Sequence, residues 1–336
     1  MRALHQRVPN LVVVANEVRE VPPDLGVEVR SLGKESGRGQ IAKGLRYQRI
    51  LADVCRRGRP VTLVAHMCPP YLNLAAPLVK ATGSRSMLWF THPAESASLH
   101  RAERLADVIV TALPGSYPRA SAKVHPIGHS IDTDHFRPQV PPPADGTLRL
   151  VAIGRTAPTK NYPVVVRAVD RARRDGVDVR LRIIGPATKP AEQAHRREIA
   201  ELISSLGLEA SVTLESDVDP ADIPDLLAGA HALVNAHSHG SADKVVFEAM
   251  ACARPPIVSS AVFAELLAND GPRLTFAEAD AADLADRMVE LSRTPAGARE
   301  ALGALLRRRV EAHHSLNHWA DEIVRLATEA HGRPAL

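Results

Sequence analysis

Short runs of β-branched and aliphatic residues alternate with longer helical stretches along the whole chain, and this alternation constrains the fold more than any other feature. Helices are predicted near Ile41–Arg57 and Tyr71–Thr82. Strands that alternate with helices favour parallel sheets with crossover helices, so we predict an α/β fold. The strands predicted in the first half are Leu11–Ala15, Val27–Leu32, Val61–Ala65, Met87–Thr91, Val108–Thr111 and Val124–Ile127.

A proline-rich segment at 137–146 has almost no apolar periodicity and is the strongest candidate for a linker. A chain of 336 residues also exceeds the usual size of one hydrophobic core. We therefore predict a first domain at 1–138, a linker at 139–147 and a second domain at 148–336.

The alternation restarts after the linker. Three helices without a further strand are predicted from Ala281 to Ala330. The strands predicted in the second half are Leu148–Ile153, Val179–Ile184, Val212–Leu214, Ala232–Asn235 and Pro256–Ser259. The helices predicted between and after these strands are Pro163–Asp175, Ala191–Leu206, Ala221–Ala228 and Lys244–Ala253.

The loop after the strand Leu148–Ile153 carries Gly154, Arg155 and Lys160, and Pro163 opens the next helix. Ligands of open parallel sheets lie beyond the carboxyl ends of the strands, where a helix N-terminus offers free N–H groups to an anion. An arginine and a lysine on this loop suit two neighbouring phosphoryl groups. The alternative is two solvated cations on an ordinary loop.

A second candidate segment follows the strand Ala232–Asn235, where a glycine-serine turn leads into a helix. Asp243 or Ser241 is a plausible cap of that helix. Glu248 lies in an otherwise apolar part of the helix, and a buried carboxylate needs a partner. It faces either a ligand or Lys244, four residues earlier.

The stretch from Leu148 to about Leu266 resembles the donor half of family 4 glycosyltransferases, which have the GT-B fold. The resemblance implies two Rossmann-like parallel-sheet domains that face a cleft. It also implies that Arg155 and Lys160 hold the donor diphosphate and that Glu248 binds the ribose hydroxyls. The residues that match the family pattern are Gly154, Arg155, Lys160, the strand end Ile183–Gly185, Glu248–Ala251 and Pro255.

The first half resembles the same family more loosely. The segments 102–111 and 131–138 match the family's elements before the linker, so we interpret Asp132 and Asp134 as part of a hinge and not as a metal-binding pair. His92 ends a strand where the family has a histidine near the transferred sugar. It contacts a donor-sugar hydroxyl or the acceptor, or else only the backbone of its own loop.

Several positions depart from the family pattern. Gly240 stands where the first of two paired glutamates is usual, and that carboxylate normally contacts the sugar. Ser238 lies one position past the motif's serine, where His237 stands. We expect the backbone N–H groups of Gly240, Ser241 and Ala242 to contact the sugar and the β-phosphate instead, with side-chain contacts from Ser241 or Lys244. Three family glycines are replaced, by Ser130, Asn161 and Ala253.

The beginning of the chain also departs from the family. The GT-B first domain opens with an apolar strand, a glycine-rich loop and a helix, whereas this sequence starts with what resembles the end of that helix, at 3–7. We therefore expect the first domain to be truncated at its N-terminus by one strand and one loop. Loss of a central strand would leave unpaired sheet edges.

The composition limits the classes of partner that we expect. The 42 basic and 38 acidic residues are interspersed and aromatic residues make up 3% of the chain, which predicts no nucleic-acid surface. No apolar run approaches the roughly 20 residues of a membrane span, and three scattered cysteines suit a reducing cytosol. A basic helix with Lys43, Arg46, Arg49, Arg56 and Arg57 touches either an anionic lipid at the inner membrane face or a phosphorylated acceptor, or it is a solvated face.

The resemblance implies a retaining transferase that moves a sugar from a nucleoside-diphosphate sugar to a hydroxyl acceptor, which is a glycan, a lipid-linked molecule or a small molecule. No cofactor and no metal are expected. The alternatives are a non-catalytic or degenerate nucleotide-sugar-binding protein or partner subunit, and an epimerase of nucleotide sugars.

Overall fold

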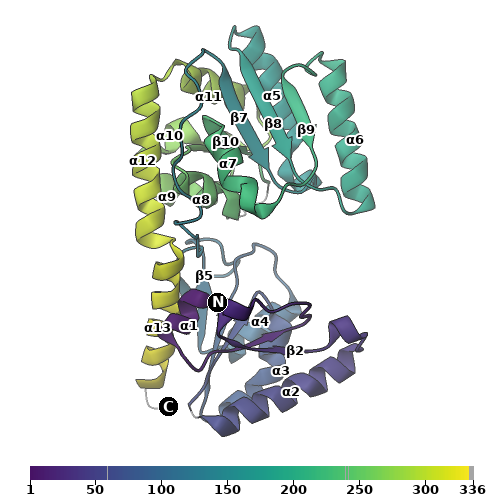
Figure 1. The fold of residues 1–336 in the computed structure, drawn as a ribbon, viewed down its shortest axis with the longest axis vertical. Coiled ribbons are helices and arrows are strands. Elements are labelled where there is room, and N and C mark those ends of the chain that lie inside the picture. The colour runs from purple at the N-terminus through teal and green to yellow at the C-terminus, as the bar shows by residue number, and fades with distance from the viewer. Residues whose placement is uncertain (59, 239, 241, 333–336) are drawn as a thin grey trace. The chain divides into compact units, whose positions relative to one another are not determined.

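The computed structural model describes residues 1–58, 60–238, 240 and 242–332. The chain forms two compact units, one of Met1–Ser130 with Leu316–Leu336 and one of Ile131–Ser315 (Figure 1). Both units are built on parallel sheets with helices between the strands, as the alternation predicts.

The first unit contains two parallel sheets, one of two strands and one of four in the order β3-β4-β5-β6. Among the described residues, β1 pairs only with β2, and β3 pairs only with β4. Val14 of β1 and Leu63 of β3 pack against the same apolar cluster, so the two sheets share a core. The strands are β1 (Val12–Ala15), β2 (Glu28–Ser31), β3 (Thr62–His66), β4 (Arg85–Trp89), β5 (Val108–Thr111) and β6 (Val124–Pro126).

Helix α2 supplies much of that shared core, because Tyr47, Leu51 and Cys55 recur at four-residue spacing on its buried face. The predicted basic surface of this helix is smaller than expected: Lys43 is buried, and Arg57 pairs with Asp53 at 2.8 Å. The helices of this part are α1 (Arg2–Arg7), η1 (Pro23–Leu25), η2 (Lys34–Ser36), α2 (Gln40–Arg57), α3 (Pro69–Ala81) and α4 (Ala97–Leu105).

The C-terminal helix α13 (Leu316–Gly332) packs on the first unit. Trp319 and Ile323 lie in one apolar cluster with Met87 and Trp89, and the two tryptophan rings meet edge to face with centroids 5.6 Å apart. The domain prediction assigned 148–336 to the second domain, whereas in the structure helix α13 belongs to the first unit. Its apolar face is buried there, against β4 and β5.

The second unit has one parallel sheet in the order β11-β10-β7-β8-β9. The chain builds outward from β7 to β9 on one side and then crosses to β10 on the other. The order therefore reverses between β7 and β10, which is where such sheets bind ligands. The strands are β7 (Leu148–Ile153), β8 (Val179–Ile184), β9 (Val212–Glu215), β10 (Ala232–Asn235) and β11 (Pro256–Val258).

Helices α5, α6 and α11 close the core on one face of this sheet, as Figure 1 shows for α5 and α6 beside β7, β8 and β9. The predicted linker carries no helix or strand, and Arg254 donates hydrogen bonds to its carbonyls at Gln139 and Val140, both at 3.5 Å. The helices are η3 (Pro158–Lys160), α5 (Tyr162–Arg174), α6 (Pro190–Ser205), η4 (Pro220–Asp222), α7 (Ile223–Ala228), α8 (Lys244–Ala251), η5 (Ala261–Phe263), α9 (Ala264–Leu267), η6 (Ala268–Asp270), α10 (Gly271–Leu274), α11 (Ala281–Arg293) and α12 (Ala296–His313).

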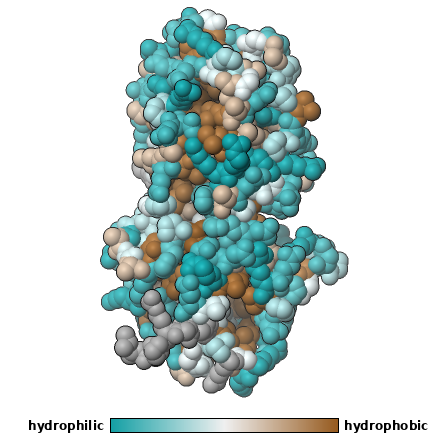
Figure 2. Space-filling model, turned by 90° about the vertical axis from the view of Figure 1, so that its left-hand side faces the viewer, coloured by the Kyte–Doolittle hydropathy of each residue, from teal (hydrophilic) through white to brown (hydrophobic). Residues whose placement is uncertain are grey.

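Hydrophilic residues cover most of the face drawn in Figure 2, and apolar residues form separate patches on it. Within the described part of the chain, no helix combines the length and the apolar character that crossing a membrane requires.

The three positions where the resembled family carries glycine all have a left-handed backbone, with φ of 53° at Ser130, 50° at Asn161 and 56° at Ala253. Ala253 lies directly after the C-cap of α8. Its N–H donates to Met250 and that of Arg254 donates to Ala249, which together close the helix end. An L-residue with a side chain is strained in this conformation, whereas glycine is not.

Replacing Ala253 with glycine should therefore stabilise the protein. Relief of the left-handed strain exceeds the added freedom of the unfolded chain, so we expect a gain of roughly 0.5–1 kcal/mol and a melting temperature higher by roughly 1–4 °C. Thermal unfolding followed by circular dichroism measures it. The control is Ala249→Gly, the same change inside α8, which should lower the melting temperature. A lower melting temperature for Ala253→Gly would contradict the account.

Candidate functional site

The loops that follow β7 and β10 meet at the carboxyl edge of the second sheet. These strands are parallel neighbours, with Leu233 beside Val151, so their ends lie at one edge. The N–H of Ser238 donates to the carbonyl oxygen of Thr159 at 2.9 Å and its hydroxyl donates to the same oxygen at 3.3 Å. The two predicted motif segments are thus joined directly.

Two glycines allow the ends of β7 and β8 to come close. A Cβ on Gly185 would lie 2.0 Å from the carbonyl oxygen of Gly154, which no side chain can occupy. A Cβ on Gly154 would lie 2.7 Å from Cε of Lys160. Tyr162 fixes the loop further, because its hydroxyl donates to the Gly154 carbonyl at 2.9 Å. Gly154 therefore acts by letting Lys160 cross its backbone.

Arg155 extends from this loop toward α6, and Nη1 lies 3.0 Å from Oε1 of Glu192. The Glu192 side chain is 4% exposed, whereas that of Arg155 is 57% exposed. Oε2 of Glu192 accepts hydrogen bonds from the backbone N–H groups of Thr188 at 2.9 Å and Lys189 at 3.2 Å. Glu192 is therefore held rigidly, and the exposed guanidinium of Arg155 can still meet an anion.

Lys160 is enclosed and paired with Asp243, the residue that precedes α8. The Asp243 carboxylate also accepts a hydrogen bond at 2.8 Å from Nδ2 of Asn235, which ends β10. Burial alone would raise the pKa of Asp243, but the charge of Lys160 and these hydrogen bonds hold it below its ordinary value. Asp243, one of the two residues predicted as the cap, takes the N-cap position, but its side chain makes no capping hydrogen bond.

Glu248 and Lys244 form the i, i+4 pair that was one of the two alternatives, with Nζ and Oε1 3.3 Å apart. The Glu248 side chain is 14% exposed, so its carboxylate is largely removed from water. This burial raises the pKa of Glu248, and the nearby ammonium of Lys244 only partly opposes the shift. Its role toward a ligand stays a prediction.

The turn before α8 offers no carboxylate at Gly240, which is exposed with a φ of 66°. A Cβ there would meet no atom within 4 Å, so space does not require a glycine, although the backbone conformation favours one. Ser241, predicted to contact the sugar, lies outside the described residues.

His92 belongs to the first unit, and the residues predicted to bind the donor belong to the second. Its Nδ1 accepts a hydrogen bond from the N–H of Ala94 at 2.9 Å, which is the backbone contact considered as its alternative. Asp132 has a comparable local role, because Oδ1 accepts hydrogen bonds from the N–H groups of Asp134 and His135 at 3.2 and 3.1 Å. Across the described residues, no three His, Cys, Asp or Glu side chains gather as metal ligands.

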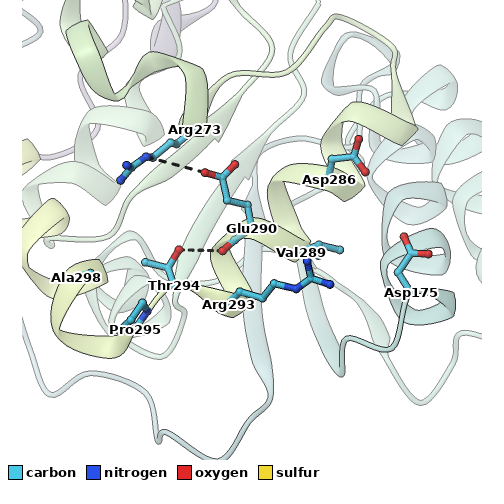
Figure 3. A pocket seen from close by; sticks show the side chains of 9 residues that line it. All are labelled: Asp175, Arg273, Asp286, Val289, Glu290, Arg293, Thr294, Pro295 and Ala298. Atoms are coloured by element: carbon cyan, nitrogen blue, oxygen red, sulfur yellow. Dashed lines mark hydrogen bonds and ion pairs between the residues drawn. The ribbon is translucent and has the colours of Figure 1, made fainter.

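A hollow of about 850 Å³ lies elsewhere in the second unit, between α5, α10, α11 and the start of α12 (Figure 3). Asp175, at the end of α5, places it near the amino edge of the sheet, away from the Arg155 and Lys160 loop. Glu290, which lines this hollow, is already paired with Arg273 at 4.0 Å and with Arg287 at 2.9 Å. We do not assign the donor to this hollow.

Sequence reasoning missed two acidic partners in the site. Glu192 has a weak local signal, because it lies three residues after Lys189 at the start of α6 and a glutamate is common there. The pairing of Asp243 with Lys160 joins residues 83 positions apart and has no local signal.

Three comparisons with known proteins bear on this site. Residues 147–294 match the family model described as glycosyl transferases group 1, which is just under half of the chain. No curated protein sequence matches the chain.

Solved structures share the whole fold at low sequence identity. A glycosyltransferase from Rickettsia africae superposes with a TM-score of 0.78 at 14% identity, over 98% of this chain and 92% of the other. Anabaena HepE in complex with UDP and glucose gives 0.76 at 13% identity, over 97% and 94%. Sucrose-phosphate synthase from Thermosynechococcus elongatus gives 0.76 at 17% identity, over 98% and 90%. The prediction of an α/β fold of the GT-B type is confirmed.

Glu248→Gln should stabilise the protein in a pH-dependent manner. The pKa of Glu248 is raised above its ordinary 4.5 by burial, so the folded state binds this proton more tightly than the unfolded state. The stabilisation of the folded state by this bound proton is therefore lost as the pH rises above the ordinary pKa of 4.5. The melting temperature of the glutamine variant minus that of the wild type should be small near pH 4 and grow toward pH 7.

The control is Glu311→Gln, which removes a carboxylate that likewise pairs with a cation four residues earlier, here Arg307, but is 42% exposed. It should show no comparable growth with pH. If the melting temperature of Glu248→Gln minus that of the wild type stays constant or shrinks between pH 4 and pH 7, the burial argument is refuted.

Proposed function

We propose that the chain is a retaining glycosyltransferase that moves a sugar from a nucleoside-diphosphate sugar to a hydroxyl acceptor. One observation carries the proposal: the Arg155 and Lys160 loop and the start of α8 converge at the carboxyl edge of β7, β8 and β10. This edge lies inside the segment that matches the group 1 family model. Two cations and a helix N-terminus suit a diphosphate.

In this mechanism the protein acts by electrostatic stabilisation and positioning. The bond between the sugar's anomeric carbon and the β-phosphate oxygen breaks, and a bond from that carbon to the acceptor oxygen forms on the same face. The departing phosphate takes the acceptor's proton. Arg155 and Lys160 stabilise the charge that develops on the diphosphate, and Glu248 binds the ribose hydroxyls.

The sugar and acceptor contacts are proposed for His92, Ser241 and the backbone at Gly240, with Ser238 and Lys244 beside the phosphates. The acceptor is a hydroxyl of a glycan, a lipid-linked molecule or a small molecule. We propose a cytosolic protein that works without a metal, with peripheral attachment at the inner membrane face as its route to a lipid-linked acceptor. The Anabaena structure with UDP and glucose supports this substrate class by analogy of fold alone.

A second candidate is a nucleotide-sugar-binding protein without transfer activity. Gly240 favours it, because this exposed turn supplies no carboxylate where the resembled family places one. Incubation with UDP- and GDP-sugars separates the two functions. Transfer to an acceptor, or slow donor hydrolysis, supports the enzyme, and NMR of the product's anomeric proton tests retention. Binding of UDP or GDP without turnover supports the second candidate.

Lys160→Met and Arg155→Ala should each lower kcat/KM for the donor by roughly 100-fold or more, because each removes a charge that stabilises the leaving diphosphate. Steady-state kinetics with the preferred donor measures the loss. Arg174→Ala serves as the control, because Arg174 is exposed and pairs with Asp170 on the outer side of α5. Full activity in Lys160→Met would remove Lys160 from the mechanism.

A further inference from the structure

Each cation of the candidate donor site is already paired with a carboxylate of the chain. Arg155 pairs with Glu192 at 3.0 Å, Lys244 with Glu248 at 3.3 Å, and Lys160 with Asp243. Three cations and three carboxylates leave these pairs without net charge. An anion that enters must therefore compete with carboxylates for the cations it needs.

The pair of Lys160 and Asp243 is the most enclosed of the three. Their side chains are 14% and 20% exposed, whereas Arg155 and Lys244 are 57% and 50% exposed. Water screens the outer two cations, and they can turn toward a ligand while they keep their partners. Charges within the protein interact more strongly than charges in water, so the inner pair sets the main competition.

Asp243 also departs from the usual behaviour of its position. An aspartate before a helix commonly accepts an N–H of the first turn, which satisfies part of the helix end. Asp243 makes no such bond, and its carboxylate lies instead between Lys160 and Asn235, which is 4% exposed. The carboxylate is thus held against Lys160, and it does not cap the helix end.

We propose that Asp243 is an internal competitor of the donor's diphosphate for Lys160, so that it weakens phosphate binding and hastens release of the nucleoside diphosphate. This inference rests on the proposed function. A phosphoryl oxygen takes the place of the Asp243 carboxylate on Lys160 when the ligand binds, and the carboxylate returns when it leaves. Asp243 acts through Lys160 and is a positioning residue, not a catalytic one.

The test is Asp243→Asn, which keeps the shape and a hydrogen-bonding oxygen but removes the charge. Isothermal titration with UDP and with GDP should show binding tighter by roughly tenfold, within the range typical of coupled sites. Stopped-flow displacement should show slower release. A purely structural role would weaken binding instead. The control is Asp145→Asn, which breaks an exposed pair with Arg149 and should leave affinity unchanged.

A double-mutant cycle ties the effect to Lys160. In the Lys160→Met background, Asp243→Asn should no longer tighten binding. Tightening that persists there, or equal or weaker binding in Asp243→Asn alone, overturns the inference while the proposed function stands. If neither the wild type nor Asp243→Asn binds UDP, GDP or inorganic pyrophosphate, the donor site itself is refuted and the inference falls with it.

Discussion

The close approach of two strand ends underlies the candidate site. The carbonyl of Gly154, after β7, lies where a side chain at Gly185, after β8, would have to stand. Because neither glycine has a Cβ, the β7 loop can turn across the edge of the sheet. Lys160 then lies over Gly154, and Arg155 reaches Glu192 on α6. A bulkier residue at either glycine would move both cations at once.

Burial of charge is the second constraint, and it divides the site into an inner and an outer part. Lys160 and Asp243 are enclosed, and each offsets part of the desolvation cost of the other's charge. Glu248 is as enclosed as these two residues, with a side chain 14% exposed, and burial raises the pKa of its carboxyl group because the half-exposed Lys244 offsets the effect only in part. A residue kept ionisable in such a place destabilises the fold, which is common for groups that bind ligands.

Local signals in the sequence predicted the elements and the cations, whereas pairings across the sheet could not be predicted. The strands Leu148–Ile153 and Val179–Ile184 were placed with their observed bounds, because long apolar runs between turn residues mark buried strands. The helix predicted to end at Ala253 ends at Ala251 because the backbone turns left-handed at an alanine, which gives no stop signal. The apolar face of α13 was readable, but its partner in the first unit was not.

The same limit applies to the chemistry. Arg155 and Lys160 were predicted from their own loop, and Asp243 from its place before a helix, but the neutralisation of Lys160 by Asp243 appears only when β7 and β10 lie side by side. This pairing changes how ligand binding should be understood. A ligand anion would displace a carboxylate from Lys160 and would not simply bind to an unpaired cation. The exchange breaks one ion pair and forms another, so the net gain in binding free energy is smaller than it would be at an unpaired lysine. We therefore expect such a site to favour a ligand that engages several of its groups together, as the proposed diphosphate would.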